Sequence, residues 1–190
     1  HVSVFVTGSQ YAGDRLRELL KLPADNFLNI PNGIAFRPAK EPREAVLGRL
    51  GIPGGFTVLG TVAVLESRKG HKYLLEALAM VRDKFSGFSK VVLLIEGLGS
   101  ERARLEELAA GLGLKENVRF LGREANVFDL MRTFDVFVLP SVGYEDFPNV
   151  ILEAMSMGKP VIGTRVAGIP EQVLDGETGL VVEPADAGAL

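Results

Sequence analysis

Short apolar runs rich in β-branched residues alternate with longer amphipathic segments along most of the chain. The apolar runs cover residues 56–64, 90–95, 117–121, 135–139, 160–164 and 179–182. Helical patterns lie between them at about 71–85, 100–112, 126–134, 149–157 and 169–174. Continuously apolar strands separated by amphipathic helices form βαβ units, whose strands are parallel and buried on both faces. The sequence therefore predicts an α/β fold, a Rossmann-like parallel sheet of roughly six strands flanked by helices.

Composition and charge narrow the class of protein. The chain has 190 residues, of which 47% are hydrophobic, so it can bury one good core and a piece of another. No apolar run approaches the length of a membrane span, and the first residues lack the pattern of a signal peptide. The absence of cysteine excludes disulfides and thiolate metal sites, and a net charge of −3 argues against a nucleic-acid partner. We therefore expect a cytoplasmic protein that binds no nucleic acid.

The stretch from Glu145 to Glu153 is the most informative for function. It follows a buried strand pattern that ends at Pro140. It combines a loop acid, a proline suited to the first turn of a helix and a second acid about one turn later. The free N–H groups at such a helix start attract phosphate, and Glu153 is placed to accept hydrogen bonds from a ribose diol. The spacing predicts a site for a nucleoside diphosphate with a sugar attached.

Six motifs in order resemble those of retaining glycosyltransferases with two Rossmann-like domains (the GT-B fold), most closely family 4, also called glycosyltransferase group 1. Glu145 to Glu153 resembles the E-x7-E signature of that family. The other motifs resemble the hinge between domains, the phosphate-contacting loop, the G-x-G turn, the base-binding edge and the segment after the E-x7-E helix: residues 30–34, 67–71, 96–99, 118–122 and 158–162. The resemblance covers nearly the whole chain from about Asn29 onward.

This resemblance implies a division of the chain and a reaction. Residues 1–36 are expected to be a remnant of the N-terminal acceptor domain with the hinge, and residues 37–190 a donor-binding domain truncated at its C-terminus. The implied reaction moves a sugar from a nucleoside-diphosphate sugar to a glycan, lipid or small molecule, with retention of configuration. The acceptor would bind through the missing N-terminal domain, so we expect the fragment to be inactive alone. In the full-length protein the resemblance also allows peripheral contact with the inner face of the membrane.

The resemblance also implies which residues form the site. Lys69 is expected to reach the diphosphate and Glu145 to lie near the donor sugar, so both are assigned catalytic roles. The remaining residues assigned to the donor are Arg68, Gly70, Gly97, Gly99, Arg123, Phe147, Pro148, Asn149, Val150 and Glu153. Lys69 and the helix end near Asn149 would stabilise the charge that develops on the departing diphosphate. Because no Asp-x-Asp occurs in the chain, we expect no metal and no cofactor besides the donor.

Two positions depart from the family's pattern. The family often has Gly-Arg where this chain has Ala63-Val64, and Val64 cannot hold phosphate as that arginine does. Arg68 would supply the missing charge from another direction, or it has only a surface role. Asp146 stands where the family usually has glycine, which predicts altered backbone contacts to the sugar.

Three further polar residues receive an interpretation. Glu96 is interpreted as solvated, and His71 as a surface residue at the start of a helix. Glu171 belongs to a Gly-Ile-Pro-Glu stretch that recurs in the family near the same cleft, but a helix-start acid explains it equally well.

Two alternatives to a transferase stay open. The first is a non-catalytic nucleotide-sugar-binding module, which is favoured by Val64 in place of the family's phosphate-binding arginine. A nucleotide-sugar 2-epimerase shares the fold and binds the same donor, but the catalytic acids and histidine of its own motifs are not seen.

Overall fold

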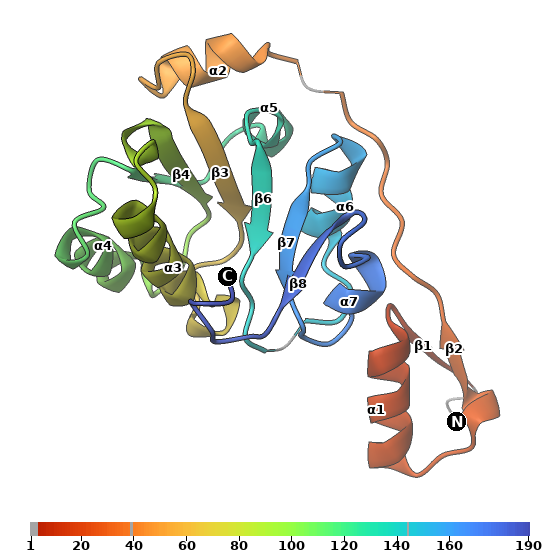
Figure 1. The fold of residues 1–190 in the computed structure, drawn as a ribbon. Helices are drawn as coiled ribbons and strands as arrows, with labels where there is room; N and C mark the ends of the chain where they lie inside the picture. The colour runs from red at the N-terminus through yellow and green to blue at the C-terminus, as the bar shows by residue number, and fades with distance from the viewer. Residues whose placement is uncertain (1–3, 39, 144) are drawn as a thin grey trace.

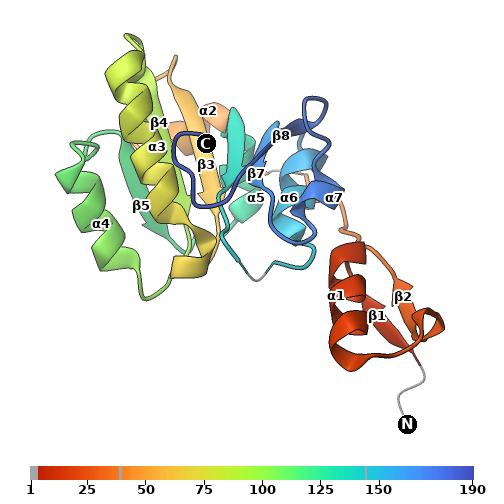
Figure 2. The same ribbon diagram turned by 60° about the horizontal axis from the view of Figure 1, so that its bottom comes forward.

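The computed structural model describes residues 4–38, 40–143 and 145–190, and within them the chain forms two units joined by an extended linker (Figures 1 and 2). Each unit is built on a parallel sheet, with two strands in the first and six in the second. The predicted division into residues 1–36 and 37–190 remains a prediction. None of the described helices is both long and apolar enough to cross a membrane.

The small unit consists of β1 (Phe5–Thr7), α1 (Gln10–Leu20), the 3-10 helix η1 (Ala24–Asn26) and β2 (Phe27–Asn29). Phe5 pairs with Phe27 across the two strands, and their rings stack with centroids 5.2 Å apart. Helix α1 covers one face of this short sheet, while Val6 and Leu28 leave 60% and 50% of their surface exposed. Parallel strands are usually covered on both faces, so the unit has an apolar face that no described residue covers.

The linker runs from the small unit along the large one to α2 (Arg43–Arg49) (Figure 1). Helix α2 packs against α5 (Val127–Arg132). The sequence pattern does not predict α2, because seven residues beginning after Pro42 are too few to show a helical period. Its buried residues are Val46 and Leu47, and Leu47 belongs to the same apolar core cluster as Leu130 and Met131 of α5.

The large unit has the predicted architecture. Its strands are β3 (Thr57–Val62), β4 (Val91–Glu96), β5 (Val118–Gly122), β6 (Val136–Leu139), β7 (Val161–Thr164) and β8 (Gly179–Val182). Besides α5, its helices are α3 (His71–Lys84), α4 (Arg102–Gly111), α6 (Asn149–Ser156) and α7 (Ile169–Gln172), with 3-10 turns η2 (Ser67–Lys69) and η3 (Phe88–Lys90). The sheet order is β5-β4-β3-β6-β7-β8, and every pair is parallel. The Rossmann-like α/β prediction is confirmed.

Two apolar layers hold the helices to the sheet. Strand β4 shows the period of two: Leu93 and Ile95 enter the layer under α3 and α4, while Val92 and Leu94 enter the opposite layer with α5, α6 and α7. All six residues of β4 are buried. Burying a large aliphatic side chain is worth about 1.5–3 kcal/mol, so the central strands supply much of the stability.

The strand order places a functional edge between β3 and β6. The chain moves outward from β3 to β4 and β5, then returns to β6 on the other side of β3. In open parallel sheets, ligands bind outside the carboxyl ends of the strands at such a reversal. The loops that follow β3 and β6 therefore lie side by side where a ligand is expected.

Candidate functional site

The loops after β3 and β6 are packed backbone against backbone. Gly70 has a left-handed φ of 69°, and a Cβ atom at this position would lie 1.9 Å from the carbonyl oxygen of Pro140. The N–H of Val142 donates to the carbonyl of Arg68 at 2.8 Å. Only glycine fits this contact, because any Cβ would overlap the Pro140 carbonyl. The predicted donor residue Gly70 thus brings the two loops together.

This packing brings the two predicted catalytic residues, Lys69 and Glu145, into a direct ion pair. Their side chains are only 12% and 7% exposed. The hydroxyl of Ser141 donates to the same carboxylate oxygen at 2.6 Å, and the hydroxyl of Thr164 donates to the Ser141 carbonyl at 2.5 Å. A buried charge is tolerated when it is paired and hydrogen-bonded in this way. The lysine and the carboxylate hold each other at the switch point of the sheet.

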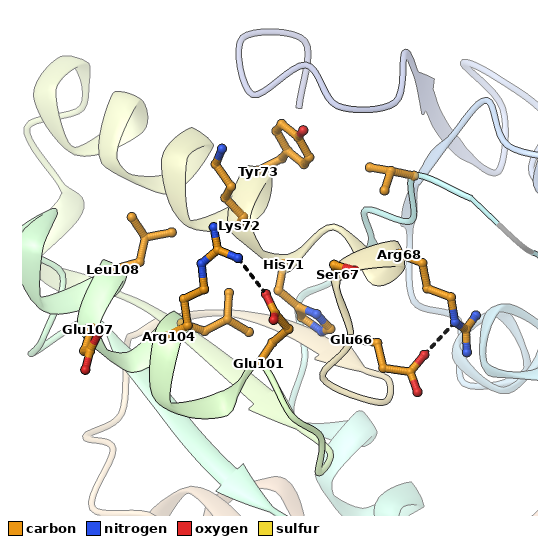
Figure 3. A pocket seen from close by; sticks show the side chains of 12 residues that line it. Glu66, Ser67, Arg68, His71, Lys72, Tyr73, Glu101, Arg104, Glu107 and Leu108 are labelled. Atoms are coloured by element: carbon orange, nitrogen blue, oxygen red, sulfur yellow. Dashed lines mark hydrogen bonds and ion pairs between the residues drawn. The ribbon is translucent and has the colours of Figure 1, made fainter.

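Arg68 points elsewhere. Its guanidinium donates to Glu66 at 2.7 Å, and it lines a cavity of about 560 Å³ between the loop after β3, α3 and α4 (Figure 3). Val64, at the position of the family's arginine, is 47% exposed. A role of Arg68 toward a diphosphate stays a prediction.

The interpretation of His71 as a surface residue is wrong. It is only 2% exposed, and neither ring nitrogen has a hydrogen-bond partner among the described residues (Figure 3). Burial, and next the positive charge of Lys69, lower its pKa from 6.5 to about 4. Gly70 draws the start of α3 against the sheet, so the first helical residue faces inward. The missed signal was spacing, because His71 lies three, four and seven positions before Leu74, Leu75 and Leu78.

Both glycines of the predicted G-x-G turn allow close contact between loops. A Cβ at Gly97 would lie 1.9 Å from the Ala63 carbonyl oxygen, and one at Gly99 would lie 2.2 Å from that of Leu65. Gly97 also has φ 139°, a conformation that other residues rarely adopt. These contacts join the loops after β3 and β4 at the carboxyl edge of the sheet.

The predicted base-binding edge is a hollow at the ends of β3, β4 and β5. Arg123 lines a cavity of about 520 Å³ together with Val62, Glu96 and Glu124. The interpretation of Glu96 as solvated is wrong, because it is 8% exposed and accepts a hydrogen bond from the Glu124 N–H at 3.2 Å. Burial raises the pKa of the Glu96 carboxyl. As the last residue of a fully buried strand, it is covered by its neighbours.

The start of α6 is held by side chains from outside the helix. Pro148 is the residue before the first helical position rather than part of the first turn. The side chain of Asn32 donates to the Phe147 carbonyl at 3.0 Å, and that of Gln172 donates to the Pro148 carbonyl at 3.2 Å. The first N–H groups of a helix have no acceptor within it, so those of Asn149 and Val150 point out of the helix end.

Glu153 lies one turn into α6 and is half-buried. Burial raises the pKa of its carboxyl, and the opposing positive charge is Arg37 of the linker. The guanidinium of Arg37 lies 5.6 Å from the ring centroid of Phe128. The linker thus supplies the charge near this acid, whereas Lys69 supplies the charge near Glu145. The prediction that Glu153 shares a concavity with Lys69 stays a prediction.

Glu145 also faces the small unit. It lines a cavity of about 590 Å³ together with Tyr11 and Leu16 of α1 and with Arg165 and Val166 after β7. Among the residues that the structure describes, no group of three or more His, Asp or Glu side chains is placed to hold a metal ion.

Comparisons with known proteins agree on one family. Residues 56–190, more than half of the chain, match the family model of glycosyl transferases group 1. A D-inositol 3-phosphate glycosyltransferase of Corynebacterium urealyticum is 37% identical over 146 residues, which is 74% of this chain and 34% of that protein. A phosphatidyl-myo-inositol mannosyltransferase of Mycobacterium leprae is 37% identical over 166 residues, which is 86% of this chain and 42% of that protein. The chain spans less than half the length of these relatives.

Solved structures give the same result for the fold. The Anabaena protein HepE in complex with UDP superposes with a TM-score of 0.87 at 26% identity, covering 98% of this chain and 51% of that one. A glycosyltransferase from Rickettsia africae superposes with a TM-score of 0.86 at 25% identity, with the same coverage. The arrangement of two units joined by a linker is therefore shared with half of each of these molecules.

Proposed function

The chain belongs to the group 1 glycosyl transferases, and from this premise we propose that its large unit is the donor half of a retaining glycosyltransferase of family 4. The donor is a nucleoside-diphosphate sugar, and the acceptor is a glycan, lipid or small molecule bound mainly by other parts of a longer protein. The observation that carries the proposal is the Lys69–Glu145 ion pair at the switch point of the sheet.

Five of the predicted residues have a chemical role in this proposal. Breaking the bond between sugar and phosphate builds negative charge on the departing diphosphate. Lys69 and the N–H groups of Asn149 and Val150 stabilise that charge, most strongly where it is greatest, in the transition state. Glu145 lies near the sugar, and Glu153 accepts from the ribose hydroxyls. Because these groups supply positive charge and the chain has no Asp-x-Asp, we propose that no metal is required.

Two cavities at the carboxyl edge of the sheet fit the two ends of such a donor. The cavity lined by Arg123 and Val62 suits a base, whose edge is read by backbone groups. The cavity shared by Glu145 and α1 suits the sugar and the acceptor group that attacks it. The nucleoside diphosphate would span the edge of the sheet from one cavity to the other, with its phosphates at Lys69.

Calorimetry on the 190-residue chain tests this proposal. UDP, other nucleoside diphosphates and inorganic pyrophosphate are titrated into the wild type, Lys69→Ala and Lys72→Ala. Lys72 is the matched control, because it lies three residues further on, is 54% exposed and pairs with Glu76 instead. We expect Lys69→Ala alone to weaken binding, by about tenfold or more for a charged hydrogen bond. If no nucleoside diphosphate binds the wild type, or if both variants bind equally well, the donor-site proposal is wrong.

A non-catalytic nucleotide-sugar-binding module is the second candidate, favoured by the exposed Val64 in place of the family's arginine. Val64→Arg distinguishes the two. Restoring the charge should strengthen pyrophosphate binding in either case, but only a transferase should gain donor hydrolysis or transfer in the full-length protein.

A further inference from the structure

The first backbone N–H groups of helix α1 find only some of their acceptors within the small unit. The first four N–H groups of a helix have no acceptor within it. In α1 the Ala12 N–H is satisfied locally, because it donates to the Ser9 hydroxyl oxygen at 3.1 Å, and the Gly13 N–H makes the first intrahelical bond, to the Ser9 carbonyl at 3.2 Å. The first turn of α1 contains no acidic residue. The N–H groups of Gln10 and Tyr11 have no acceptor among the described residues of the small unit.

The missing acceptors come from the large unit. Gln10 N–H donates to one carboxylate oxygen of Glu171 at 2.8 Å, and Tyr11 N–H donates to the other at 2.9 Å. Glu171 belongs to α7, 160 residues further along the chain. A negative charge at a helix N-terminus is also favoured by the helix dipole. One carboxylate therefore caps a helix that belongs to the other unit.

Asp146 makes a second contact of the same kind. Its carboxylate accepts from Gly8 N–H at 3.1 Å and from the Ser9 hydroxyl at 2.5 Å. The two units are closely packed at this point, since a Cβ at Gly168 of the large unit would lie 2.6 Å from the Ser9 Cβ of the small unit. Asp146 directly follows Glu145, so this contact lies on the loop that carries the proposed sugar-site acid.

We propose that Asp146 and Glu171 form an interunit latch, which clamps the start of α1 onto the large unit and so positions the small unit over the loop of Glu145. All four contacts are hydrogen bonds to carboxylates. Such charge-assisted bonds are about twice as strong as neutral ones. Exposed ion pairs between long side chains are weak because both side chains must be ordered. Here three of the four donors are backbone N–H groups, which are already fixed. Asp146 in place of the family's usual glycine then has a reason, because a glycine has no carboxylate to hold Ser9.

The distance between the units tests the latch directly. The chain has no cysteine, so Glu18→Cys on α1 and Lys84→Cys on α3, both exposed positions, give a clean pair of spin labels. We expect one narrow distance distribution by pulsed electron resonance. Asp146→Gly with Glu171→Ala should add a broader population, whereas the control Glu116→Ala with Glu177→Ala removes the same charge from exposed acids outside the latch and should not. The same distribution in the latch variant and the control would overturn the proposal.

Amide exchange measured by NMR gives a second readout at the contact itself. Glu171→Ala should speed the exchange of the Gln10 and Tyr11 amides by about tenfold or more, while Glu171→Gln, which keeps one acceptor oxygen, should have a smaller effect. This milder variant keeps the test decisive if the double variant does not fold. Faster exchange without any change in the distance distribution would reduce Glu171 to a local cap and overturn the latch. The proposal does not depend on nucleotide binding.

Discussion

Lys69 and Glu145, which are 76 residues apart in the chain, meet as a nearly buried ion pair across the line where the strand order reverses. Each residue reaches this point from a different loop, one after β3 and one after β6. The pair therefore exists only because those two strands are neighbours in the sheet. A diphosphate that bound to Lys69 would have to share it with the carboxylate or displace it.

Neutralising the carboxylate of this pair tests that competition. Glu145→Gln keeps the shape and an oxygen for Ser141 and Lys69, but it removes a negative charge beside the proposed phosphate position. We expect inorganic pyrophosphate to bind more tightly by about 1 kcal/mol or more, roughly fivefold, because the carboxylate charge that is removed is nearly buried beside the proposed phosphate position. Calorimetry measures this, and weaker binding of pyrophosphate would contradict the placement of the phosphates at Lys69.

The ribose role of Glu153 is tested by comparing two ligands. Glu153→Gln should weaken a nucleoside diphosphate more than inorganic pyrophosphate, because only the nucleoside carries the hydroxyls that the carboxylate accepts. A charged hydrogen bond is worth about 1.5–3 kcal/mol, so the difference between the two losses should be on the order of tenfold. Equal losses for both ligands would leave Glu153 as a helix-end charge. Lys69→Ala, which should weaken both alike, serves as the comparison.

The buried His71 should make stability depend on pH. Its pKa is 6.5 when unfolded and about 4 when folded, so between these values the unfolded chain binds more protons. This contribution to stability is fully present above the unfolded value and is lost as the pH falls toward 4. Between about pH 7.5 and pH 5 the loss should be about 2 kcal/mol.

His71→Leu, which does not titrate, isolates this effect. Urea unfolding of wild type and variant at both pH values gives the free energies of unfolding. On acidification the free energy of unfolding should fall less in the variant than in the wild type. The difference is the contribution of His71, because the other groups titrate in both proteins. An equal loss in both would show that the histidine is accessible to protons in the folded state.

Gly70→Ala should disrupt the contact that holds the two loops together. Gly51→Ala is a matched control, because Gly51 has nearly the same left-handed φ of 67° but open space around its Cβ position. The control should cost about 1–2 kcal/mol for the backbone conformation alone. Gly70→Ala should cost more, because the added Cβ would strike the Pro140 carbonyl. Thermal unfolding measures the loss of stability in both variants. Equal losses would mean that the two loops can move apart freely.

The strands were predictable because their signal is local. Each of the six strands of the large unit lies within one or two residues of a predicted apolar run, and α3, α6 and α7 begin where the pattern indicated. Burial of a parallel strand on both faces requires an uninterrupted apolar run, and such a run is visible in the sequence itself. Helix α2 was missed for the opposite reason, since its seven residues are held by packing on α5 rather than by their own pattern.

Burial of polar residues was harder to predict: the spacing of His71 places it on the apolar face of α3, but no pattern in the sequence marks Glu96 as buried. Both residues are buried because neighbouring loops close over them. Those loops close where Gly70 and Gly97 let one backbone touch another. A sequence shows that a glycine is present, but not which carbonyl will lie against it.

The sequence by itself determined the α/β class, the family motifs and the residue types at the site, because strand periods, glycine turns and the Glu145 to Glu153 spacing are fixed within short stretches of chain. Only the tertiary structure decided which of those residues meet. Lys69 was paired with Glu145, and Glu171 with the start of α1, by contacts between segments far apart in sequence. The reason is that charges and hydrogen bonds act over a few ångströms, and such distances are set by the order of strands in the sheet and not by order along the chain.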